Sequence, residues 1–349
     1  MNILAIETSC DETACAIVED GSNILSNIVN SQIDIHKIYG GVVPEIAARS
    51  HIEAIMPVVE KAISDSKITW EKIDAIAVTH TPGLLGSLLV GTLTARTLAI
   101  LHNKPLYAIH HLKSHIYANW LETTQTSTPQ FPLLALVISG GHTQIIKMDH
   151  HNDFHIIGST RDDAVGEVFD KVAKILGLPY PGGPSIAQSA LKGNPEKYQL
   201  PIPQVDNLDF SFSGLKTAVL RRIQKELNLP ISTPSFELKN HLAEQQINDF
   251  AASFQATVSK IFIKKITKAL EENPSVKSLV IAGGVSANQN LKENIQKTFE
   301  NQVKIHVPNP KFSTDNAAMV ASAAFYSIQS GQKSTDPYSL DISPRSVIS

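Results

Sequence analysis

Two histidines four residues apart are the strongest candidates for chemistry in this sequence. His111 and His115 lie in a segment, 110–120, where this spacing is one helical turn, so both imidazoles project from one face and could share a metal ion. Such a site needs a third ligand. Zinc proteases with this spacing carry a glutamate directly after the first histidine, and Leu112 stands there instead, which argues against a protease. The competing interpretation is an ordinary pair of helix histidines in a chain that contains 13.

Three glycine-rich turns are the next candidates, because glycine lets backbone amides approach a ligand closely. Ser139-Gly140-Gly141-His142 lies between two predicted strands, and an ordinary hairpin turn is the alternative there. Pro181-Gly182-Gly183-Pro184 begins a helix, where a rigid interhelix turn is the favoured interpretation of the motif alone. The segment 282–288 follows a strand and opens a helix, a context that suits a phosphate or the adenosine part of a nucleotide. No Walker sequence is present, and no strand is followed by GxGxxG.

Acidic and basic residues complete the candidate set. Asp315 precedes a predicted helix over 317–328, so its position alone favours a helix cap. Asp11 and Glu12 lie in the first predicted hairpin, where acids are usually solvated. Two basic sets on predicted helices are more typical of solvated faces than of an RNA site. They are Lys216, Arg221, Arg222 and Lys225, and Lys260, Lys264, Lys265 and Lys268.

The elements that position these residues follow a repeated order. Each half of the chain predicts a hairpin-rich sheet followed by a strand, a glycine turn and a helix. This favours an α/β fold with two duplicated domains facing each other across a cleft. We expect residues 1–130 to form the first domain and residues 131–349 the second, with a helical insertion at about 164–272.

Composition limits the remaining classes. The chain has 349 residues, 42% of them hydrophobic, which is typical of a folded protein with two domains. No apolar run reaches the length of a membrane helix and no basic segment precedes the first strand, so we expect a cytoplasmic protein. Two cysteines exclude a disulfide framework, and a net charge of −3 gives no general attraction to nucleic acid.

Taken together and in order, these motifs resemble one family, the TsaD family of tRNA threonylcarbamoyladenosine synthesis proteins, long labelled O-sialoglycoprotein endopeptidases. The resemblance runs from Ile3 to about Ser327. Its marks are Ile6-Glu7-Thr8-Ser9-Cys10-Asp11-Glu12-Thr13, Pro44-Glu45 with Arg49 and His51, His111-x3-His115, Ser139-Gly140-Gly141-His142-Thr143, Phe169-Asp170-Lys171, Tyr180-Pro181-Gly182-Gly183-Pro184, Phe210-Ser211-Phe212-Ser213-Gly214-Leu215-Lys216, Gly283-Gly284-Val285-Ser286-Ala287-Asn288 and Thr314-Asp315-Asn316.

The resemblance implies the duplicated actin/Hsp70/sugar-kinase (ASKHA) fold and a site for each part of the reaction. The family's metal ligands match His111, His115 and Asp315, which supplies the third ligand. This donor set suits a divalent metal as Lewis acid, with Fe²⁺ favoured and Zn²⁺ the alternative. A nucleotide, threonylcarbamoyl-adenylate or ATP/ADP, is expected near Val137, Ile138, Ser139, Gly140, Gly141, Asp170, Gly183 and Asn288.

The implied reaction transfers a threonylcarbamoyl group from threonylcarbamoyl-adenylate to N6 of the adenosine 3′ of the anticodon, in tRNAs reading codons that begin with A, and releases AMP. Because the donor is already activated, the site must position and polarise it, and no nucleophilic side chain is required. Glu12 and Asp11 are the candidates for the general base. The implied partners are tRNA, the inactive-site paralogue TsaB, the small ATPase TsaE and a TsaC-type enzyme that supplies the adenylate.

Three alternatives remain open on the sequence. A small-molecule kinase or ATPase of the same fold usually carries Asp-x-Gly-Thr in the first hairpin, where this chain has Glu7-Thr8-Ser9-Cys10. A metalloprotease lacks its adjacent glutamate here. A scaffold subunit of the modification complex would not need the set of His111, His115 and Asp315.

Overall fold

The structure is a computed structural model that describes residues 1–122, 128–346 and 348. The chain divides into two compact units, each built on a five-stranded mixed sheet. The first unit comprises Met1–Gln130, Met148–His155 and Pro308–Ser349, and the second comprises Phe131–Lys147 and Ile156–Val307.

The first unit's sheet has the order β3-β2-β1-β4-β5. Its strands are β1 (Asn2–Glu7), β2 (Glu12–Glu19), β3 (Asn23–Ser31), β4 (Ala75–Thr81) and β5 (Leu106–His110). The first three strands pair antiparallel, with Ile3 opposite Val18, and β1, β4 and β5 run parallel. β1 is the central strand of this order, and its side chains from Ile3 onward are therefore buried on both faces.

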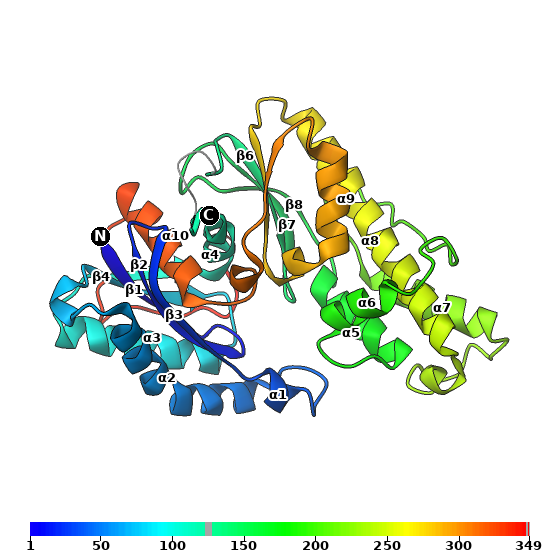
Figure 1. The fold of residues 1–349 in the computed structure, drawn as a ribbon, viewed down its shortest axis with the longest axis horizontal. Coiled ribbons are helices and arrows are strands. Elements are labelled where there is room, and N and C mark those ends of the chain that lie inside the picture. The colour runs from blue at the N-terminus through cyan, green and yellow to red at the C-terminus, as the bar shows by residue number, and fades with distance from the viewer. Residues whose placement is uncertain (123–127, 347, 349) are drawn as a thin grey trace. The chain divides into compact units, whose positions relative to one another are not determined.

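Helices cover both faces of this sheet. The helices of this unit are α1 (Ile33–His36), α2 (Pro44–Ser66), α3 (Leu85–Leu101), α4 (His111–Tyr117) and α10 (Ala317–Gln329), with short 3₁₀ turns η1 (Trp70–Lys72), η2 (Ala118–Trp120) and η5 (Pro310–Phe312). Figure 1 shows α2 and α3 against one face and α10 against the other. α10 and α4 pack together, which brings two segments 200 residues apart side by side.

The second unit repeats the first strand for strand. Its sheet order is β10-β9-β6-β7-β8, the same order as the first sheet read from the other edge. The strands are β6 (Leu133–Ile138), β7 (Thr143–Met148), β8 (His155–Ser159), β9 (Ser278–Ala282) and β10 (Lys304–His306). The predicted duplication is therefore confirmed.

The helices of the second unit include the predicted insertion. They are α5 (Val165–Leu176), α6 (Gly182–Ala190), α7 (Ser213–Glu226), α8 (Glu244–Glu272) and α9 (Gln289–Phe299), with 3₁₀ turns η3 (Leu238–His241) and η4 (Gly284–Ala287). Residues 164–272 contain helices and loops and no strand, as expected. α8 presents Phe250, Phe254 and Phe262 at helical spacing to a core shared with α5 and α7.

The C-terminal part of the chain differs from the expected division. We expected residues 131–349 to form the second domain, but Pro308–Ser349 groups with the first unit, and so does the segment Met148–His155. The reason is packing, since α10 lies against β1, β2, β4 and β5 of the first sheet. This arrangement places Asp315 in the same unit as His111 and His115.

Candidate functional site

The two histidines lie on a short helix whose start is fixed by a third histidine. β5 ends at His110, and α4 begins at His111. The His110 Nδ1 atom accepts a hydrogen bond from the Leu112 backbone N–H at 3.2 Å, so this imidazole caps the helix. Burial, followed by the neighbouring His111, lowers the pKa of His110 to about 3, so the ring stays neutral and able to accept.

Asp315 does not cap the helix that follows it. The cap is Asn316, whose side-chain oxygen accepts a hydrogen bond from the Met319 N–H at 3.1 Å, while its Nδ2 donates to the Thr314 carbonyl at 2.8 Å. The cap interpretation of Asp315 is therefore wrong. Because its neighbour supplies the cap, the Asp315 carboxylate is left to face the histidine pair.

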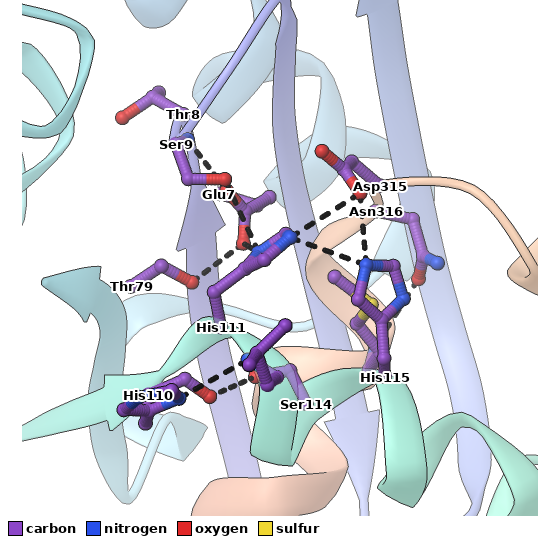
Figure 2. A network of polar contacts seen from close by, with 12 residues as sticks. Glu7, Thr8, Ser9, Thr79, His110, His111, Ser114, His115, Asp315 and Asn316 are labelled. Carbon is purple, nitrogen blue, oxygen red and sulfur yellow. Dashed lines mark hydrogen bonds and ion pairs between the residues drawn. The ribbon is translucent and has the colours of Figure 1, made fainter. Parts of the chain in front are cut away.

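The three side chains present their donor atoms to one another. His115 Nε2 lies 3.1 Å from His111 Nε2 and 3.1 Å from Asp315 Oδ1, and His111 Nε2 lies 3.6 Å from Asp315 Oδ1. Figure 2 shows the two rings and the carboxylate converging from α4 and from the segment before α10. The site is buried on the histidine side, with Asp315 retaining 19% of its side-chain exposure.

A buried glutamate fixes the orientation of His111. Glu7, the last residue of β1, is fully buried, and its Oε2 lies 3.2 Å from His111 Nδ1. The Ser9 N–H donates to Glu7 Oε1 and the Thr79 hydroxyl donates to Glu7 Oε2, both at 2.6 Å. A carboxylate on Nδ1 makes that nitrogen the donor and turns Nε2 toward His115 and Asp315 (Figure 2), which is the usual outer-shell arrangement of metal-binding histidines.

The electrostatics of this site favour a cation. Burial works against charge on His111, but Asp315 and Glu7 outweigh it and raise the pKa of His111 to about 9. Burial likewise opposes charge on Asp315, yet His111 and then His115 lower the pKa of Asp315 to about 2. Two anionic carboxylates around one imidazole pair therefore attract a positive charge, whether a proton or a metal ion.

The residues fit a divalent metal. Two imidazole nitrogens and one carboxylate oxygen lie within 4.8 Å of one another, and this N₂O set leaves further coordination positions open. His115 Nδ1 is buried and has no hydrogen-bond partner among the described residues, so this ring's contacts are made through Nε2. Such a donor set suits Fe²⁺ or Zn²⁺.

The two acids proposed as general base lie in the same unit, on the loop and start of β2. Glu12 is half-buried, and its Oε1 accepts from the Ser31 hydroxyl at 3.2 Å. Burial, then the charges of Asp315 and Asp11, raise the pKa of Glu12 well above its usual range. The Asp11 carbonyl accepts from the Gln32 N–H at 3.1 Å, which ties this loop to the end of β3.

The second unit contains a cavity of about 560 Å³ lined by four of the eight residues expected around a nucleotide. These are Gly140, Asp170, Gly183 and Asn288. Ser139 and Gly141 flank Gly140 in the β6–β7 turn, outside the lining. Val137 and Ile138 are fully buried in β6 and so support the turn without lining the cavity.

Backbone constraints shape this cavity. Asp170 Oδ1 accepts from the Gly182 N–H at 2.6 Å, which ties α5 to the start of α6, and burial raises the pKa of Asp170. Gly283 adopts φ +88°, and a Cβ there would lie 2.5 Å from the Ile138 carbonyl oxygen. Asn288 caps α9 by accepting from the Leu291 N–H and donates its amide to Gln255. Gly183 has open space around its Cβ position.

Comparison with known proteins decides the family. The sequence profile described as "TsaD: tRNA N6-adenosine threonylcarbamoyltransferase" matches residues 23–322. A protein of that name from Syntrophomonas wolfei is 48% identical over 345 residues, which cover 98% of this chain and 96% of the relative. A second, from Caldicellulosiruptor saccharolyticus, is 46% identical over 99% of this chain and 97% of its own length. The chain belongs to the TsaD family.

Solved structures confirm the ASKHA-type fold. HypF from T. kodakarensis superposes with a TM-score of 0.63 at 13% identity, covering 94% of this chain and 48% of HypF. Component A of the (R)-2-hydroxyglutaryl-CoA dehydratase from Acidaminococcus fermentans gives 0.52 at 14% identity, covering 95% and 99%. At these identities the likeness concerns the fold alone.

Family membership makes this TsaD-family chain an enzyme, a transferase that forms threonylcarbamoyladenosine in tRNA. Within the described part of the chain, no helix is long and apolar enough to cross a membrane.

One residue of the basic sets is unavailable to RNA, since Lys265 is buried and its Nζ donates to the carbonyls of Val205 and Asn207.

Sequence reasoning on this TsaD-family chain missed the supporting residues of both regions. Glu7 belongs to the first motif, and an acid that ends a continuous apolar strand is a signal for a buried, paired charge. Thr79, 72 residues from Glu7, carried no such signal. Gln255, Gly166 and Glu293 line the cavity of the second unit from elements whose approach only the fold reveals.

Proposed function

We propose that this chain transfers the threonylcarbamoyl group of threonylcarbamoyl-adenylate to N6 of the adenosine 3′ of the anticodon, using a metal site in the first unit and a nucleotide site in the second. The observation that carries this assignment is the convergence of His111, His115 and Asp315 on one point, with Glu7 behind His111. No nucleophilic side chain is needed, because the adenylate is already an activated acyl donor.

His111, His115 and Asp315 would hold the metal ion. When bound, the ion supplies a Lewis acid that can polarise an oxygen of the acyl group, and Fe²⁺ is favoured over Zn²⁺. Glu7 holds the His111 ring so that Nε2 faces His115 and Asp315, where it would be available to the metal, and Ser9 and Thr79 hold Glu7. Burial of Glu7, His111 and His115 limits the movement of the two imidazoles, so their geometry is set before the substrate arrives.

The adenylate or a related nucleotide would bind in the cavity of the second unit. Gly140 and Gly183 place little side-chain bulk there, and the backbone N–H of Gly183, at the start of α6, can donate to an anionic group. The amide of Asn288 and the carboxyl of Asp170 provide polar groups for the ribose or base. Ser139 and Gly141 position the Gly140 turn, and Val137 and Ile138 anchor it in β6.

Glu12 would remove the proton from N6, with Asp11 as the alternative base. The charge of Asp315 acts on the Glu12 carboxyl, so this candidate base lies near the proposed metal ligands. Replacement of the base should lower turnover and leave the metal content unchanged.

An exposed apolar surface on the first unit supports a protein partner, which we propose to be the paralogue TsaB. The surface is formed by residues four apart on each of two packed helices, Ile52 and Met56 of α2 and Leu85, Leu89 and Leu93 of α3. Exposed apolar residues gathered in this way are typical of an interface. Leu89→Asp should abolish co-purification, and Ile231→Asp, a similar change at an exposed apolar residue of the second unit outside the cavity lining, should not.

The remaining partners follow from the reaction. Exposed lysines on the insertion helices, Lys225, Lys260 and Lys264, are the proposed contacts for tRNA phosphates. A TsaC-type enzyme would supply the adenylate, TsaE would act as the small ATPase, and the cytoplasm, where tRNA is used, would be the location.

The test is nucleoside mass spectrometry of bulk tRNA from cells depleted of this protein and complemented with variants. We expect threonylcarbamoyladenosine to disappear on depletion, to return with the wild type and with His241→Ala, an exposed histidine elsewhere, and not with His111→Ala. If His111→Ala restores the nucleoside, the metal assignment is wrong. If depletion changes nothing, the chain does not perform this reaction in those cells.

A further inference from the structure

A second group of metal-ligating side chains lies in the first unit, apart from His111, His115 and Asp315. It occupies the turn between β7 and β8, which reads Asp149-His150-His151-Asn152-Asp153-Phe154-His155. Ligand atoms of Asp149, Asp153 and His155 lie within 4.8 Å of one another. None of these residues belongs to the machinery described above.

The turn already arranges its imidazoles around one carboxylate. His155 Nε2 lies 2.8 Å from Asp153 Oδ1, and His150 Nε2 lies 3.7 Å from Asp153 Oδ2. His150 keeps 76% of its side-chain exposure and His155 keeps 60%, whereas Asp153 keeps 23%, so the site is open to solvent on its imidazole side.

The remaining side chains of the turn, His151 and Asn152, hold its backbone by contacts with α4 and α10. His151 stacks on Tyr326 of α10 with ring centroids 4.3 Å apart, and its Nδ1 lies 3.1 Å from the hydroxyl of Tyr117, the last residue of α4. Ser327 donates to the Asn152 side chain at 3.1 Å. A turn anchored in this way presents its outward carboxylates and imidazoles with little conformational freedom left to lose on binding.

The donor set determines the kind of ion. Imidazole nitrogens are poor ligands for Ca²⁺ and Mg²⁺, which prefer oxygen, and good ligands for Zn²⁺, Ni²⁺ and Cu²⁺. Two imidazoles and two carboxylates on one turn can supply four ligands to a tetrahedral Zn²⁺ ion.

We propose that the β7–β8 turn is a second metal site of this protein, which binds a Zn²⁺-class divalent ion through Asp153 and His155 with support from Asp149 and His150. The ion would brace the turn against α4, which carries His111 and His115, and against α10, which follows Asp315 in the chain. This proposal does not depend on the transferase activity.

The chain carries its own reporter for this site. Trp120 lies beside the turn, with its ring 5.6 Å from that of His151, and Trp70 is the other tryptophan of the chain. The test uses the full-length chain with Trp70→Phe, so that Trp120 is the only fluorophore of its kind, and with His111→Ala and His115→Ala to remove the first site. Zn²⁺ binding is measured by equilibrium dialysis, and Ni²⁺ binding by quenching of Trp120 fluorescence.

We expect one equivalent of Zn²⁺ and saturable quenching by Ni²⁺. His155→Ala and Asp153→Asn should each weaken both by at least about 10-fold, since even outer-shell changes cost that much at metal sites. His241→Ala, which removes an exposed imidazole from the second unit, should change neither. Substoichiometric Zn²⁺ binding, unchanged affinity in both turn variants, or an equal loss in His241→Ala would each overturn the proposal.

Discussion

In the first unit the loop after β1 carries acids and hydroxyls, whereas in the second unit the equivalent loop, after β6, carries two glycines. β1 ends in Glu7 and continues into Ser9, both of which contact or support His111. β6 ends in Ile138 and continues into Gly140, whose backbone lines a cavity. The strand order around both loops is the same. One scaffold thus presents charged side chains in one copy and exposed backbone in the other.

The difference follows from what each region would hold. A metal ion needs fixed nitrogen and oxygen ligands, and their charges must be paired when they are buried. A nucleotide needs space and backbone donors, which glycine provides. Each region lies within one unit, so changes in one should leave the binding function of the other intact.

The largest expected effect comes from removing the anionic ligand of the first unit. Asp315→Asn should eliminate the bound metal and lower the rate of threonylcarbamoyl transfer at least ~100-fold, because Lewis-acid polarisation is worth several kcal/mol. Nucleotide binding to the second unit should stay at the wild-type level. Metal analysis, a single-turnover assay with tRNA and calorimetry with nucleotide check the three outcomes.

Asp206→Asn, at an exposed acid of the second unit, is the matched control and should behave as the wild type. Retention of both metal and turnover in Asp315→Asn would remove the distinction between the two units.

A smaller effect is expected from the glutamate behind the histidine. Glu7→Gln keeps the shape of the side chain but removes the charge that orients His111, so the metal affinity should fall about 10- to 100-fold. Turnover at saturating metal should fall less than the affinity does. Ser9→Ala, which removes only the hydroxyl 3.1 Å from His111 Nδ1, should have a lesser effect. An affinity equal to that of the wild type in a metal titration would contradict the role of Glu7.

The sequence allowed the duplication, the helical insertion and the shared helix face of the two histidines to be predicted, because each depends on local patterns. Alternating and helical periodicities, glycine turns and the four-residue spacing of His111 and His115 are all short-range signals. Asp315 was assigned to the metal only through resemblance, since its local pattern suggested a helix cap. The structure shows why that pattern misled, because Asn316 supplies the cap.

What could not be predicted depends on contacts between distant segments. Because α10 packs on the first sheet, Asp315 lies beside His115, which is 200 residues earlier in the sequence, and no periodicity encodes that pairing. The Thr79 hydroxyl reaches Glu7 only because β1 and β4 pair in parallel. Likewise, Gln255 of α8 meets Asn288 only after the insertion has folded over the glycine turn.

Within the second unit, bulk in the cavity should affect the donor and not the metal. Gly183→Val places a side chain in open space that lines the cavity, so the KM for threonylcarbamoyl-adenylate should rise about 10-fold, as expected when a pocket loses the volume of a few methyl groups. Metal content should not change.

Gly214→Val is the matched control, because Gly214 is also the second residue of a helix with open space at its Cβ and lies outside the cavity lining. Equal KM values for the two variants would show that the cavity does not hold the donor.

The smallest effect concerns a carboxylate with a structural role. In the first unit Glu7 is buried to serve the metal site, whereas in the second unit Asp162 is exposed and serves the start of α7. Its oxygens accept from the Phe212 and Ser213 N–H groups at 2.7 and 3.3 Å and from the hydroxyls of Ser211 and Ser213. Asp162→Ala should therefore destabilise the second unit by about 1 kcal/mol, the usual cost of a lost cap.

The contribution of Asp162 to the stability of the second unit should depend on pH. Burial alone would raise the pKa of Asp162, but the hydrogen bonds from Ser211, Phe212 and Ser213 outweigh it and lower the pKa below the usual 3.8. The stabilising contribution is therefore present above the unfolded-state pKa and is lost as the pH falls through the lower pKa of the folded state. Thermal melts should show wild type above Asp162→Ala at pH 7 and the two converging as the pH falls below 3.8. A constant difference across that range would mean that the side chain's packing, and not its charge, stabilises α7.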